Sequence, residues 1–123
     1  MNSKVFLVLR ILLGLFVLVF GLNKFIGFIP DFPLEGDALA YFGALTNSKT
    51  MTLVAIVEIV AGLALITNKF GALLAIILMS VSVNAVLFHA TLDPANSAGA
   101  IALLVLNIAV LIGYKDKYKA LLN

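Results

Sequence analysis

The sequence predicts an all-α integral membrane protein: a four-helix bundle in up-down-up-down order, with a short interfacial helix in the first outer loop. Three observations lead to this prediction. The 123 residues are 63% hydrophobic and only 11% charged, whereas soluble domains carry about 25% charged residues. Four long apolar runs follow one another without the ~10-residue alternation of a membrane barrel. Polar residues interrupt these runs, and each is costly in hydrocarbon unless it faces a partner or a wet interior.

The four apolar runs approach the length of roughly 20 residues that a helix needs to cross the hydrocarbon core. The second and fourth runs are slightly short, which a thin bilayer or flanking side chains that reach the surface would accommodate. The first run is expected to be retained, because the nearest small-x-small cleavage pattern lies well beyond it. We therefore expect a single transmembrane domain, residues 1–123, with spans at about 5–28, 51–67, 70–88 and 98–114.

Two of the connections between the spans are short. Asn68-Lys69 leaves so little chain that the second and third spans must be antiparallel neighbours. Asp93-Pro94 stops the third helix and precedes the fourth.

The first connection, residues 29–50, is long and contains prolines and acids: Pro30, Asp31, Pro33, Glu35 and Asp37. Its middle carries Leu39, Phe42 and Leu45 at threefold spacing. This pattern predicts an amphipathic helix over 37–46 at the membrane surface. An ordered loop with incidental apolar contacts is the alternative.

The basic residues predict the orientation of the bundle. If both termini lie on one side, that side holds most of the positive charge: Lys4, Arg10, Lys69, Lys115, Lys117 and Lys119. The opposite side holds Lys49 and, at the end of the first span, Lys24. Because positive residues favour the cytoplasmic side, we expect both termini in the cytoplasm.

The composition excludes several classes of function. The chain has no cysteine and one histidine, which excludes a disulfide framework, thiol redox chemistry and a bis-histidine haem site within one chain. We expect no metal site. A net charge of +2 that lies at the ends of the spans indicates topology signals and no nucleic-acid partner. No dinucleotide fingerprint, phosphate-binding loop or nucleophile elbow is present.

The first and second spans each carry a stripe of small and charged residues, which should face the bundle. At ~100° per residue, Arg10 and Lys24 share one face with Gly14 and Gly21. Glu58, near the middle of the second span, shares a face with Gly62. We expect the glycines to let the helices approach closely, and Glu58 to pair with Arg10 or Lys24. A pair that only fixes helix packing is the alternative to a functional one.

The third and fourth spans add three polar candidates. Asn84 and His89 lie on nearly opposite sides of the third helix. Asn84 is a candidate ligand-binding residue or an interhelical hydrogen-bonding residue. His89 is a candidate proton relay or an interfacial residue with its polar tip among the headgroups. Asn107 is expected to hold helices together.

Depth in the bilayer brings part of this set together. At 1.5 Å per residue, Lys24 lies roughly 12 Å and Asn84 roughly 6 Å outward of the midplane, where Glu58 lies. Lys24, Glu58 and Asn84 are therefore expected to line a pocket that opens outward, with His89 at its mouth. Arg10 is expected to reach Glu58 from the cytoplasmic side.

Three short motifs stand out in the first two spans: LRILLG at 9–14, FGLNKF at 20–25 and VEIVAG at 57–62. Their order and spacing resemble the DoxX family of small four-helix membrane proteins. VNAVLFH at 83–89 with LDP at 92–94 is similar to the bacterial DoxX-like branch. The resemblance covers nearly the whole chain. It implies a four-helix protein of the bacterial inner membrane.

The resemblance also implies candidate functions. Some relatives are associated with quinone-linked sulfur oxidation, as the membrane subunit of a thiosulfate:quinone oxidoreductase, and others with complexes that handle oxidative stress. The wider group includes thiol-redox proteins, whose chemistry does not transfer to a chain without cysteine.

We therefore expect a membrane subunit that binds a quinone or a lipid-like ligand, with no tightly bound cofactor and no complete catalytic apparatus. Membrane lipid, a redox partner protein and a second copy of the chain are the expected partners. A structural or assembly subunit and, less favoured, a small proton-coupled transporter using Glu58 are the alternatives.

Overall fold

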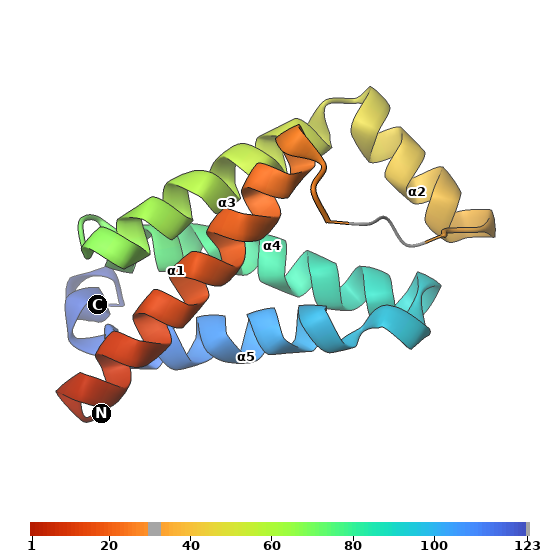
Figure 1. The fold of residues 1–123 in the computed structure, drawn as a ribbon. Coiled ribbons are helices and arrows are strands. Elements are labelled where there is room, and N and C mark those ends of the chain that lie inside the picture. The colour runs from red at the N-terminus through yellow and green to blue at the C-terminus, as the bar shows by residue number, and fades with distance from the viewer. Residues whose placement is uncertain (30–32, 123) are drawn as a thin grey trace.

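A computed structural model describes residues 1–29 and 33–122 of the chain (Figure 1). Over these residues the fold is all-helical, without strands, as the sequence predicts. Pro30 and Asp31 of the first connection lie outside the described residues. Five α-helices and two 3₁₀ helices follow in order: α1 (Ser3–Ile26), α2 (Gly36–Asn47), α3 (Thr50–Thr67), α4 (Gly71–Leu92), η1 (Pro94–Asn96), α5 (Ala98–Gly113) and η2 (Lys115–Leu121).

Three helices, α1, α3 and α4, are each long and apolar enough to cross a membrane. A fourth span results if α5 and η2, which bend by 75° at their junction, are counted as one. The expected third span ended at residue 88, whereas α4 continues to Leu92. The helix continues because the first residue that disfavours it is Pro94, which restricts the backbone of the residue before it.

The four long helices pack around one apolar core. α1 packs chiefly on α3, and α4 packs on both α3 and α5, while α5 also contacts α1. In Figure 1 the N-terminus lies at the same end of the molecule as the C-terminal segment η2. The largest fully buried apolar side chains come from all four helices: Leu13, Val17, Leu65, Leu78 and Val110.

The contact between α1 and α3 is made through glycine, as the stripes on these helices predict. A Cβ atom added to Gly62 would lie 2.8 Å from the carbonyl oxygen of Gly14 and 2.8 Å from the Cβ atom of Leu18. A Cβ atom on Gly14 would likewise lie 3.0 Å from the carbonyl oxygen of Gly62. The two backbones therefore touch at a level where any larger residue would separate them.

The helix predicted at residues 37–46 is present as α2. It packs on α3 and on the C-terminal part of α4. The ring centroids of Tyr41 and Phe42 lie 5.3 Å and 4.9 Å from that of Phe88. α2 is thus attached to the bundle through an aromatic cluster, while its position at a membrane surface stays a prediction.

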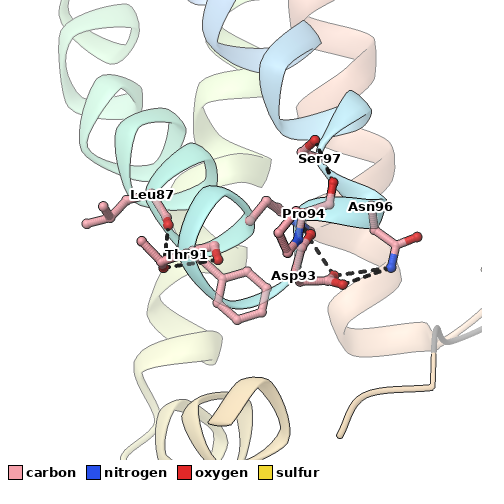
Figure 2. Close-up of polar contacts among 8 residues, drawn as sticks. Leu87, Thr91, Asp93, Pro94, Asn96 and Ser97 are labelled. Carbon is pink, nitrogen blue, oxygen red and sulfur yellow. Dashed lines mark hydrogen bonds and ion pairs between the residues drawn. The ribbon is translucent and has the colours of Figure 1, made fainter. Parts of the chain in front are cut away.

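The turn between α4 and α5 is closed by its own side chains (Figure 2). The Nδ2 atom of Asn96 donates to the Asp93 carboxylate at 3.0 Å, and the Ser97 hydroxyl donates to the carbonyl oxygen of Pro94 at 2.9 Å. In the last turn of α4 the Thr91 hydroxyl donates to the carbonyl oxygen of Leu87 at 2.7 Å. These bonds pair the polar side chains of the turn with partners from the same short segment.

Candidate functional site

The central polar feature is an ion pair between α1 and α3. The Nζ atom of Lys24 lies 2.6 Å from Oε1 of Glu58. The Glu58 side chain is 5% exposed and the Lys24 side chain 25% exposed. Gly21, one turn before Lys24, makes room for the carboxylate, because a Cβ atom at Gly21 would lie 3.0 Å from that of Glu58. The acidic member of the pair, Glu58, is thus buried, whereas the basic member, Lys24, is partly exposed.

Arg10 does not pair with Glu58, so that expectation is wrong. Its Nη1 atom donates to the carbonyl oxygens of Leu65 and Ile66. These carbonyls lie in the last turn of α3, where helix carbonyls lack intrahelical partners and the helix dipole is negative. Arg10 and Lys24 are roughly 21 Å apart along α1, and the carboxylate pairs with Lys24.

Asn84 does not join the ion pair either. It is exposed, and its Nδ2 atom donates to the carbonyl oxygen of Ser80 in its own helix at 2.8 Å. The face of α4 that is buried carries two large residues, Leu78 and Phe88, and three small ones, Gly71, Ala75 and Ser82. Both faces of this helix hold polar residues. The buried face is the one with Ser82, because its small side chains let α5 and α3 approach. The expected pocket of three converging residues is therefore corrected to a pair.

His89 lies in a separate cluster at the end of α4. Its Nδ1 atom lies 3.3 Å from Oδ2 of Asp93 and 3.3 Å from the carbonyl oxygen of that residue. Asn96 donates to the same carboxylate, which fixes its position. The ring of His89 meets that of Phe88 edge to face at 4.9 Å. The His89 contacts therefore come from α4 and the following turn, and none of them is with Lys24 or Glu58.

Asn107 lies at the centre of a buried hydrogen-bond network between α4 and α5. It is fully buried, accepts from the Ser82 hydroxyl at 2.7 Å and donates to the carbonyl oxygen of Ala75 at 3.0 Å. The packing role expected for Asn107 thus matches its contacts. Ser82 was not singled out as its partner, although seven residues separate Ala75 from Ser82, which places them on one helix face.

Replacing Asn107 with alanine should destabilise the bundle by about 1–2 kcal/mol, toward the upper range for hydrogen bonds between membrane helices. The Ser82→Ala variant should cost less, because the Asn107 amide then still bonds to Ala75. Unfolding in detergent micelles, titrated with SDS and followed by circular dichroism, measures both values. Equal stability of Asn107→Ala and the wild type would show that this network contributes nothing.

A second group of polar contacts was missed by sequence reasoning and lies at the end of the bundle that holds η2. The Tyr114 hydroxyl donates to Oδ1 of Asn68 at 2.5 Å, and the Tyr118 hydroxyl donates to the carbonyl oxygen of Ala72 at 2.8 Å. A tyrosine hydroxyl is neutral at physiological pH, so both hydroxyls can donate. The four-residue spacing of the two tyrosines was the available signal.

These tyrosines border a groove of about 630 Å³ between the start of α4, the end of α5 and η2. The second principal hollow, of about 260 Å³, lies on the first turns of α1. Neither hollow is lined by Lys24, Glu58 or Asn84. Within the described residues no three His, Asp or Glu side chains are grouped so that they would hold a metal ion.

Comparison with known proteins identifies one family. The sequence model of the DoxX family matches residues 5–91. This region contains α2, α3 and almost all of α1 and α4, and with them the Lys24–Glu58 pair, Arg10 and His89. Comparison with the curated proteins and with the solved structures gives no match.

Proposed function

Because the chain belongs to the DoxX family, we propose that this multi-pass membrane protein binds a quinone or a lipid-like ligand at the Lys24–Glu58 pair, as a subunit of a membrane redox complex. The observation that carries the proposal is the asymmetry of the pair: the Glu58 side chain is 5% exposed, and its carboxylate lies 2.6 Å from the ammonium group of the Lys24 side chain, which is 25% exposed. Ionisable residues within membrane spans are costly and are commonly functional.

The chemistry of the pair suits the head of a quinone. The partly exposed ammonium group of Lys24 has further hydrogens with which it donates to a ring oxygen. Glu58 carries a proton to that oxygen, and the apolar surfaces beside the pair accommodate the tail. Reduction to a quinol consumes two electrons and two protons. This chain supplies a proton path, and a redox partner protein supplies the electrons.

His89 has a more distant role in this proposal. When Nδ1 of His89 is protonated, it donates a hydrogen bond to Asp93. Nε2 of the ring is then the atom that exchanges protons. The cluster lies at the outer end of α4, where it relays protons between water and the bundle. Asn84 has no part, because its exposed side chain bonds within α4.

Quinone binding in detergent should depend on the pair. Lys24→Ala and Glu58→Gln are each expected to weaken binding about 10- to 150-fold, the loss of one charged hydrogen bond at about 1.5–3 kcal/mol. Asn84→Ala is the matched control, with the binding of the wild type. Quenching of the tyrosine fluorescence by a short-chain quinone gives the dissociation constants. Equal binding by all four proteins would refute the proposal.

We further propose that α1, α3, α4 and α5 cross the bacterial inner membrane in up-down-up-down order with both termini in the cytoplasm. The three helices that meet the length criterion and the bent α5–η2 pair support four crossings, and the lysines beside Asn68 and after Tyr114 support the orientation. Reporter fusions at Lys69 and Lys49 should lie on opposite sides, with Lys69 cytoplasmic. A cytoplasmic Lys49 would invert the arrangement.

One observation favours the structural alternative. Among the described residues, no buried side-chain nitrogen or oxygen lacks a hydrogen-bond partner. A bundle whose polar groups only lock the helices would have this property. The binding measurement above distinguishes the two functions, since a structural subunit would bind no quinone.

A further inference from the structure

We propose that the groove between α4, α5 and η2 binds one anionic phospholipid, with the lipid phosphate at Lys117 and an acyl chain along the apolar wall. This inference goes beyond the proposed redox role, because it concerns the opposite end of the bundle and uses none of the residues of the Lys24–Glu58 pair. It requires that the helices cross the membrane, and it holds for either orientation.

The wall of the groove is apolar and partly exposed. It is lined by side chains from the start of α1, the start of α4 and the end of η2, namely Phe6, Phe70, Leu73, Ile76 and Leu121. Phe70 is 78% exposed and Leu121 71% exposed, although both are large and apolar. Such side chains at the end of a membrane helix are favourably covered by lipid chains. A volume of about 630 Å³ is sufficient for the upper part of a lipid and not for a whole molecule.

The charges around the groove are mostly positive. Lys117 lines it, and exposed lysines flank it at Lys69, Lys115 and Lys119. Asp116 also lines the groove, but its carboxylate lies 3.4 Å from the ammonium group of Lys119, which compensates its charge. Clusters of lysine at the end of a membrane helix attract anionic headgroups. The complementary ligand is therefore a lipid with net negative charge, not a zwitterionic one.

The groove is formed before any ligand arrives. The hydroxyl groups of Tyr114 and Tyr118 bond to Asn68 and to the backbone of Ala72, so that η2 is held against the start of α4. The T-shaped contact of Phe6 with Tyr114, with centroids 4.8 Å apart, attaches α1 to the same assembly. A preformed site loses little conformational entropy on binding, which favours a specific lipid over a diffuse annulus.

Lys117 and Lys115 provide a matched test, because they lie two residues apart on η2 and only Lys117 lines the groove. The purified protein is placed in nanodiscs that mix phosphatidylglycerol with phosphatidylcholine, released into detergent, and analysed for retained lipid by native mass spectrometry. We expect one retained phosphatidylglycerol and no retained phosphatidylcholine. Lys117→Gln should reduce this retention about fivefold, the effect of one lysine at an anionic surface. Lys115→Gln, which removes a flanking charge, should reduce it clearly less, and Lys49→Gln should retain wild-type amounts.

Phe70→Ala tests the apolar wall without changing any charge, and it should also reduce retention. Circular dichroism of each variant verifies that the helices are intact. Because an excess of inorganic phosphate lacks the acyl chain, it should not displace the lipid. Equal losses in Lys117→Gln and Lys115→Gln, equal retention of both lipids, or displacement by phosphate alone would each overturn the proposal. Loss of quinone binding would not affect it.

Discussion

The Glu58→Ala variant should lose about 3 kcal/mol of folding free energy, and Glu58→Gln should lose clearly less. Removing one partner of a buried ion pair leaves an uncompensated charge, which costs about 3–5 kcal/mol. The lower end applies here because the remaining partner, Lys24, is a quarter exposed and reaches toward water. Glutamine keeps an oxygen that accepts from the ammonium group, whereas alanine keeps none.

The test is an SDS titration of each variant in detergent micelles, followed by circular dichroism. The single variant Lys24→Met and the double variant Lys24→Met with Glu58→Gln complete a cycle that isolates the pair itself. Asn84→Ala is the control, and as an exposed substitution it should change stability by no more than about 0.5 kcal/mol. If Glu58→Ala were as stable as the wild type, the carboxylate would not be buried between α1 and α3.

The second large effect is expected at Gly62. Alanine there should destabilise by about 1–3 kcal/mol through overpacking, and leucine should prevent the native contact of α1 with α3. The reason is that the added Cβ atom meets the Gly14 carbonyl and Leu18 at 2.8 Å, and a backbone atom cannot yield as a side chain can.

Gly99 offers a control, because the change in stability on substitution by alanine should have the opposite sign there. It lies within α5 and nothing is within 4 Å of the Cβ atom that alanine would add. Gly99→Ala should therefore stabilise by up to about 1 kcal/mol, since alanine favours the helix. The same titration measures all three variants. Destabilisation by Gly99→Ala together with a neutral Gly62→Ala would contradict this account of the packing.

The sequence predicts the helices well because their signals are local. Apolar length, the prolines and the glycine stripes lie within single segments, and they correctly indicate the long helices, α2, and the close contact of α1 with α3. The Lys24–Glu58 contact was one of two predicted pairings for Glu58. Choosing between Lys24 and Arg10 required the axial offset of α1 against α3, which depends on packing.

The outward position of Asn84 was not predictable for a related reason. α4 has a nearly uniform hydrophobicity around its axis, so the amphipathic pattern that assigns a face is weak. Its burial is decided by small side chains at Ala75 and Ser82, whose partners lie on α5. The contacts of Tyr114 and Tyr118 were missed because they depend on the 75° bend between α5 and η2, which places these hydroxyl groups beside the start of α4.

The two anchors of α1 on α3 also determine which motions the bundle permits. Arg10 holds the last turn of α3, and Lys24 holds Glu58 about two turns before it. A slide of α1 along α3 by one helical turn, ~5.4 Å, would break both attachments at once and press Gly62 against larger side chains. The two attachments therefore oppose sliding of α1 along α3, whereas a rotation of the α1–α3 pair against α4 and α5 would preserve both of them.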